Sequence, residues 1–145
     1  MRFNSTAVST NRTDAALTVL RVIVGSIFAA HGAQKLFVYG FAGVQGAFGQ
    51  MGVPMADVVG PAVAIVEFFG GLALVAGLLT RLASLGLAAT MIGAIAMVHF
   101  AAGFFGPNGM EFPLSLLAAT VAFTIAGAGR YSLDAAIAKT RTARS

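Results

Sequence analysis

The stretch VVGPAVAIVEFFGGLALVAGLL, residues Val58–Leu79, is apolar throughout except for one charged residue, Glu67. At 1.5 Å per residue, a helix of this length crosses the roughly 30 Å of hydrocarbon in a lipid bilayer. A soluble protein can bury one such helix in its core. Whether this stretch is a membrane span therefore depends on the rest of the chain.

Three further stretches have the same character: Ala15–Phe37, Leu82–Phe105 and Phe112–Ala128. A chain of 145 residues cannot bury four apolar helices of this length in a soluble core. The pattern predicts an all-α fold, a polytopic transmembrane four-helix bundle. Within the first span, Arg21 interrupts the uncharged run that a cleaved signal peptide requires, so we expect that helix to be retained.

Composition supports this interpretation. The chain is 58% hydrophobic and only 10% charged, whereas an ordinary globular protein is about 25% charged. Its mean hydropathy is +0.88. It has no cysteine, which excludes disulfides, a thiol nucleophile, cysteine-ligated iron–sulfur clusters and zinc fingers.

The basic residues predict the orientation. Neither the connection 38–57 nor the connection 106–111 contains Lys or Arg. Seven of the nine basic residues lie on the other side of the predicted membrane: Arg2, Arg12, Arg81, Arg130, Lys139, Arg141 and Arg144. By the positive-inside rule both termini are cytoplasmic. The same placement explains the pI near 10.4 without nucleic-acid binding.

The segments outside the spans are short. Residues Met1–Asp14 are polar and are expected to form a disordered cytoplasmic tail, followed by a transmembrane domain over 15–131. In the basic tail 132–145, Ser132 is placed to cap a short amphipathic helix, Leu133–Lys139. The glycine-rich connection Val38–Asp57 fits either a loop lying on the bundle or a re-entrant or interfacial segment.

Polar residues inside the spans are the candidate functional groups, because a charge at the bilayer centre costs roughly 2.5–3.5 kcal/mol and needs a partner or a role. With the predicted orientation, most of them converge on the outer half of the membrane. The catalytic candidates are His31 and Glu67, and the ligand-binding candidates are Arg21, Gln34, Lys35, His99 and Glu111. No metal site is predicted.

Each candidate also has a structural interpretation. Glu67 is either one half of an ion pair with Arg21 or Lys35, or a group that handles protons or ligand. His31 and His99 are of the residue type best suited to proton exchange, but a histidine between helices often only bonds a carbonyl group. Lys35 can extend to the interface, and Glu111 can serve as a favourable charge at a helix N-terminus.

Several short motifs, taken in order, resemble the DoxX family of four-helix membrane proteins. They are Leu20-Arg21…Gly25…Phe28…His31-Gly32…Lys35-Leu36, Gly52-Val53-Pro54, Glu67…Gly70-Gly71, Gly77-Leu78-Leu79-Thr80-Arg81, Gly109-Met110-Glu111-Phe112-Pro113 and Gly129-Arg130-Tyr131-Ser132-Leu133-Asp134. The resemblance covers roughly Leu17–Asp134. It implies a multi-pass protein of the bacterial cytoplasmic membrane, related to subunits of quinone-linked oxidoreductases.

The leading functional hypothesis is therefore a membrane subunit of such a system that binds a quinone or a similar lipid-soluble redox molecule. His31 or Glu67 would accept a proton, while Lys35 and Gln34 would hold a carbonyl oxygen. The chain contains no nucleotide- or flavin-binding fingerprint, so electrons would come from a protein partner or a bound redox group. The cofactor stays unknown on this reasoning, with quinone as the candidate.

Three alternatives stay open. His31 and His99 at matched depth could ligate a b-type haem. The chain could instead be a non-catalytic scaffold or assembly partner for a soluble oxidoreductase, or a small proton-coupled transporter that requires oligomerisation. Membrane lipid and either a protein partner or a second copy are the expected contacts, and nucleic acid is not.

Overall fold

A computed structural model describes residues 5–143, which are helical apart from short connections and contain no strand. The elements in order are α1 (Ser5–Ala33), η1 (Gln34–Tyr39), α2 (Gly40–Gln50), α3 (Ala56–Ala76), α4 (Thr80–Ala94), η2 (Ile95–His99), α5 (Glu111–Ala126) and α6 (Leu133–Thr142). The elements η1 and η2 are short π-helical turns that continue α1 and α4. The predicted all-α fold is confirmed.

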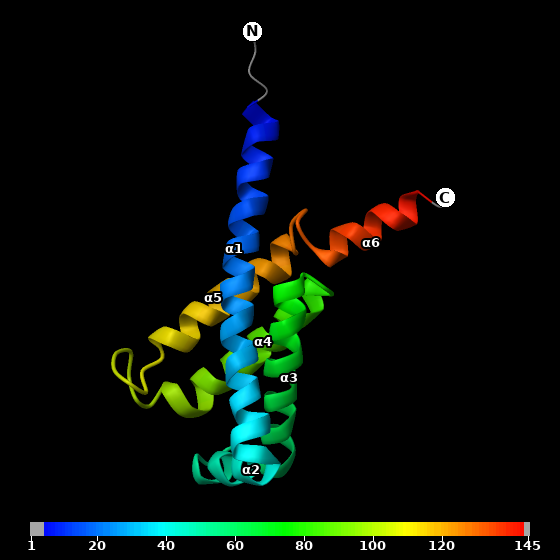
Figure 1. Ribbon diagram of the computed structural model, residues 1–145. Coiled ribbons are helices and arrows are strands. Elements are labelled where there is room, and N and C mark those ends of the chain that lie inside the picture. Colours follow the sequence, from blue (N-terminus) through cyan, green and yellow to red (C-terminus); the bar gives the residue numbers. More distant parts are fainter. Residues whose placement is uncertain (1–4, 144–145) are drawn as a thin grey trace.

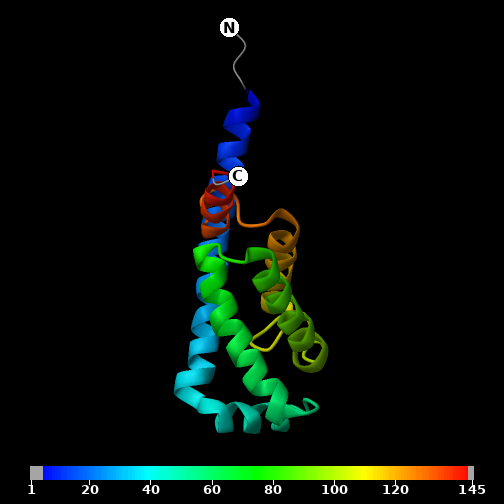
Figure 2. The same cartoon turned by 90° about the vertical axis from the view of Figure 1, so that its right-hand side faces the viewer.

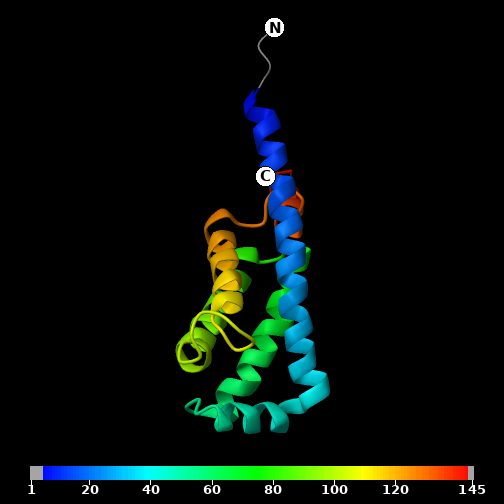
Figure 3. The same cartoon turned by 90° about the vertical axis from the view of Figure 1, so that its left-hand side faces the viewer.

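The four long helices form two pairs. Helix α1 packs along α3, and α4 packs along α5. The α4–α5 pair crosses behind α1 at an angle (Figure 1), and the pairs are joined by the turn between α3 and α4. Figures 2 and 3, which show opposite sides, place α2 across one end of the bundle. Both ends of the described chain lie towards the other end, as an even number of membrane crossings requires; their cytoplasmic location stays a prediction.

Within residues 5–143, three helical segments are long and apolar enough to cross a membrane: Thr10–Gln50, Ala56–Ala76 and Thr80–His99. The fourth, α5, has 16 residues and is about 24 Å long at 1.5 Å per residue. Large apolar side chains such as Ile23, Leu85 and Ile125 are exposed on the outside of the bundle. Such a surface is typical of a protein that contacts lipid tails rather than water.

Glycines set the close approach of α1 and α3. A Cβ atom added to Gly25 would lie 2.8 Å from the carbonyl oxygen of Gly71, and one added to Gly32 would overlap the backbone of Phe68. In lipid, where apolar burial adds little, such backbone contact is a main source of helix association. The apolar core is formed by Val24, Phe28, Leu74, Leu87, Met91, Leu116 and Phe123.

Two segments differ from the sequence-based expectations. Residues 5–14, expected to be disordered, continue helix α1 because no proline or glycine interrupts them; residues 1–4 of that tail lie outside the described chain. The connection 38–57 contains helix α2, so the loop alternative is wrong. The predicted cap is confirmed, since the Ser132 hydroxyl accepts a hydrogen bond from the Ala135 amide at the start of α6.

Candidate functional site

A cavity of about 750 Å³ lies between the two helix pairs, in the half of the bundle that contains α2. Its walls come from α1 and η1, the first half of α3, the second half of α4 with η2, and the start of α5. Residues of α2 and the turn after it close one side. Most lining residues are apolar; the ionisable ones are His31, Lys35, Glu67 and His99.

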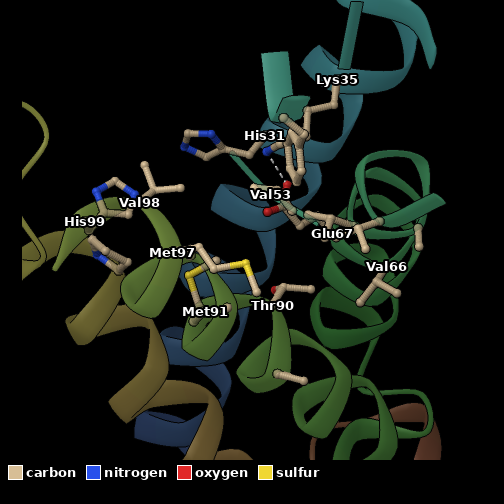
Figure 4. Close-up of a pocket in the computed structure, with 18 of the residues that line it drawn as sticks. His31, Lys35, Val53, Val66, Glu67, Thr90, Met91, Met97, Val98 and His99 are labelled. Carbon is tan, nitrogen blue, oxygen red and sulfur yellow. Dashed lines mark hydrogen bonds and ion pairs between the residues drawn. The ribbon is translucent and has the colours of Figure 1, made fainter. Parts of the chain in front are cut away.

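The charged centre of this cavity is an ion pair. The Lys35 ammonium donates a hydrogen bond of 2.5 Å to Oε2 of Glu67 (Figure 4). Glu67 is only 5% exposed, whereas the Lys35 side chain is 20% exposed. Each charge compensates the other in a medium that would otherwise penalise both. Of the two partners considered for Glu67, the structure therefore selects Lys35.

The two histidines line the cavity from different helix pairs. His31 of α1 lies against Phe112, with ring centroids 6.2 Å apart. Nδ1 of His99 is 2.8 Å from the carbonyl oxygen of Asn108. Because a carbonyl only accepts, a neutral His99 carries its proton on Nδ1 and leaves Nε2 as an acceptor. His99 belongs to η2 and Lys35 to η1, and π-helical turns of this kind are frequent at functional sites.

The remaining three candidates do not line the cavity. Gln34 and Glu111 are exposed, and Glu111 lies in the first turn of α5, where its charge is favourable. Arg21 is buried near the α3–α4 turn. Its guanidinium donates hydrogen bonds of 3.0 Å to the carbonyls of Leu74 and Val75, and one of 2.8 Å to that of Tyr131. Arg21 thereby connects α1, the end of α3 and the segment before α6.

Asp134 completes this connection and was not identified from the sequence as a site residue. Its carboxylate accepts hydrogen bonds from the amides of Leu79 (2.7 Å) and Thr80 (3.0 Å), at the start of α4. Burial raises the pKa of Asp134, but these amides and the nearby Arg21 charge outweigh it, so the pKa lies below its usual range. The partners are about 55 residues upstream, a distance no local pattern reveals.

Sequence reasoning also missed the uncharged residues on the far side of the cavity. Thr90, Met91 and Met97 lie across from Glu67 (Figure 4). The Thr90 hydroxyl donates to the Leu87 carbonyl at 2.8 Å, which leaves its oxygen able to accept. Nothing distinguished these residues from ordinary helix packing in the sequence. Within residues 5–143, no group of three or more His, Asp or Glu side chains is placed to hold a metal ion.

The DoxX family model matches residues 16–100, which is more than half of the chain. The chain belongs to the DoxX family. It is therefore a multi-pass integral membrane protein. The match includes α3 and most of the cavity walls, but ends before α5.

Relatives of this DoxX protein are bacterial. A protein of Bacillus subtilis named "Putative oxidoreductase CatD" is 37% identical over 121 residues, which cover 80% of this chain and 82% of the relative. An uncharacterized membrane protein of Mycobacterium tuberculosis is 33% identical over 135 residues, covering 86% and 82%. An uncharacterized protein of Haemophilus influenzae is 33% identical over 122 residues, covering 81% and 87%. No solved structure matches the chain.

Proposed function

We propose that this DoxX protein binds a quinone or a similar lipid-soluble redox molecule, as the membrane subunit of an oxidoreductase system in the bacterial cytoplasmic membrane. The observation that carries the proposal is the cavity itself: an apolar space within a membrane bundle that contains one buried ion pair and two histidines. The name of the Bacillus subtilis relative supports the same class of chemistry.

The lining residues supply what quinone chemistry requires. Reduction of a quinone takes up two electrons and two protons, and oxidation of a quinol releases them. Lys35 can donate a hydrogen bond to a quinone carbonyl, while Glu67 and Nε2 of His99 can accept a proton from a quinol hydroxyl. His31 lines the same space and is a second acceptor. The electrons pass to or from a partner oxidoreductase, which the proposal requires.

The test is extraction of bound lipid from protein purified in mild detergent, comparing wild type with Glu67→Gln and His31→Ala. Wild type should carry quinone, and both variants should lose most of it. Glu111→Gln is the matched control, since Glu111 is exposed and outside the cavity. Folded wild-type protein without quinone, or variants that retain it, would contradict the proposal. A Soret band in the absorption spectrum would instead support the haem alternative.

A second candidate, a scaffold that docks a soluble oxidoreductase, is favoured by one surface. Helix α6 extends away from the bundle (Figure 1) and presents Lys139 and Arg141 near its end. If docking is the whole function, charge reversal at Lys139 and Arg141 abolishes recovery of the partner, while Glu67→Gln changes only the amount of protein. If Glu67→Gln loses quinone reduction while its abundance is unchanged, the scaffold function is excluded.

A further inference from the structure

The cavity opens sideways between α3 and α4. Eight of its lining residues are exposed, and four of these lie on the two helices that flank this side: Val58 and Ala62 on α3, and Ala89 and Met97 on or just after α4. All four are apolar and lie in helices that are long and apolar enough to cross a membrane. Glu67, in contrast, is 5% exposed. This side of the cavity therefore faces lipid tails, while Glu67 lies deeper inside.

Small residues give this opening its width. A Cβ atom built on Gly93 meets no other atom within 4 Å, so there is free space beside α4 at this point. Two turns earlier the gap closes, because a Cβ on Gly86 would lie 3.4 Å from a methyl group of Val66. The space between the helices is thus a slot, which we call the α3–α4 slot, lined at its opening by Ala62, Ala89 and Gly93.

The size of the cavity indicates a ligand larger than a single ring. About 750 Å³ lies within the range of roughly 300–1,000 Å³ that encloses a drug-sized molecule. The ionisable groups are the Lys35–Glu67 pair and the two histidines, whereas Ala62, Ala89 and Gly93 at the opening of the α3–α4 slot carry no polar side chain. This division matches a molecule with a compact polar head and an apolar tail.

We infer that the ligand is a quinone with a long hydrocarbon tail, whose ring lies at Lys35 and Glu67 and whose tail leaves through the α3–α4 slot beside Gly93. The inference rests on the proposed function. In a bilayer the tail gains no hydrophobic energy by leaving lipid, so its contribution is van der Waals contact and depends on fit. A side chain that fills the slot should therefore discriminate against the tail and leave ring binding intact.

The experiment compares decylubiquinone with the same ring lacking its decyl chain, titrated calorimetrically into wild type and Gly93→Leu in one detergent. Each probe partitions into the detergent micelles to the same extent with either protein, so this partition cancels when wild type and Gly93→Leu are compared. Overpacking of this size should lower the affinity for decylubiquinone by about tenfold and the affinity for the tailless ring by less than about twofold. Ala89→Leu, which enters the same slot, should behave alike and serves if Gly93→Leu fails to fold.

The matched control is Gly46→Leu. Gly46 lies in α2, outside the cavity, and a Cβ there also meets nothing within 4 Å. Gly46→Leu should change neither the affinity for decylubiquinone nor the affinity for the tailless ring. Equal weakening of both probes by Gly93→Leu, or no change in either, would overturn the inference while leaving the ring site in place. A phospholipid in the slot would also overturn the inference. Such a lipid would co-purify with wild type but not with Gly93→Leu, and decylubiquinone would not displace it. If wild type binds neither probe, the proposed function itself fails.

Discussion

Glu67 shows how one residue in a membrane bundle serves both structure and chemistry. Apart from Asp57 in the first turn, it is the charged residue of α3; it is almost fully buried, and Lys35 of η1 compensates it. The pair connects the first and second long helices of the chain. Within the cavity, the pair also brings the Glu67 carboxylate, which can accept a proton, into contact with the Lys35 ammonium, which can donate a hydrogen bond.

Removing one partner of the Lys35–Glu67 pair should therefore lower the free energy of unfolding much more than removing both partners. Lys35→Met leaves Glu67 without compensation, and we expect a loss of about 3–5 kcal/mol in the free energy of unfolding. The double variant Lys35→Met/Glu67→Gln should recover most of this loss. Unfolding in mixed detergent, followed by helical circular dichroism, measures each value. Additive effects in the double variant would show that the pair does not contribute to stability.

Asp134 predicts a dependence of stability on pH. Because its pKa is lower in the folded protein than the ordinary value of about 3.9, the folded state favours the ionised carboxyl. The resulting stabilisation is present above that ordinary value and is lost as the pH falls through the folded pKa.

The unfolding midpoint of wild type should accordingly fall as the pH is lowered below about 4. Asp134→Asn keeps a capping oxygen but has no charge, so its midpoint should depend less steeply on pH in this range. Asp57→Asn, at an exposed position, is the control and should follow wild type. Parallel curves for Asp134→Asn and wild type would refute the assignment.

At the scale of elements, the α1–α3 contact determines the geometry of the site. These helices approach closely because Gly25, Gly32 and Gly71 have no side chains, and the Lys35–Glu67 pair lies along the same interface. The π-helical turns η1 and η2 then carry Lys35 and His99 beside the cavity. A change in helix separation is therefore also a change in the site.

Gly32→Ala tests this dependence. Its Cβ would overlap the backbone of Phe68, which cannot move without shifting α3, and we expect a loss of about 1–3 kcal/mol in stability together with weaker ligand retention. Gly46→Ala, in the open helix α2, should be neutral or slightly stabilising because alanine favours helix. Thermal unfolding of both variants decides the matter. A neutral Gly32→Ala would mean that the two helices are not held at this distance.

At the scale of the whole molecule, two helix pairs meet at one end and enclose a cavity towards the other. The end near α6 is held by Arg21 and Asp134, which join α1, α3, α4 and the segment before α6. The end near α2 contains the cavity, where the Lys35–Glu67 pair joins α3 to η1 and where Gln45 and His99 make local hydrogen bonds. Side-chain hydrogen bonds to the backbone thus hold the helices together at one end, while the cavity lies towards the other.

The orientation of this molecule is directly measurable, since the chain lacks cysteine and each introduced cysteine is unique. In intact cells, a membrane-impermeant maleimide should label Gln50→Cys, at the end of α2, and not Thr140→Cys in α6. Both positions are exposed. After lysis both should react. The reverse pattern would place the termini outside and contradict the positive-inside prediction.

The sequence alone determined the four apolar helices, the membrane environment and the residues worth testing. Long apolar runs, charge placement and the cost of an intramembrane charge are local or additive properties, readable along the chain. The Ser132 cap is of the same kind. Helix α2 was ambiguous because glycines 40, 43, 46 and 49 lower its helix propensity; in the structure it is helical and packs on α3.

Tertiary structure alone decided which candidates share a space. Helical periodicity allowed Arg21 and Lys35 to face the same interior, but Lys35 reaches Glu67, while Arg21 bonds carbonyls at the far end of α3. The angle between the helix pairs creates the cavity, and it brings Thr90, Met91 and Met97 opposite Glu67. The hydrogen bonds of Lys35 and Arg21 join residues 32 to 110 positions apart, and they depend on helix crossing and backbone contact, which no local pattern contains.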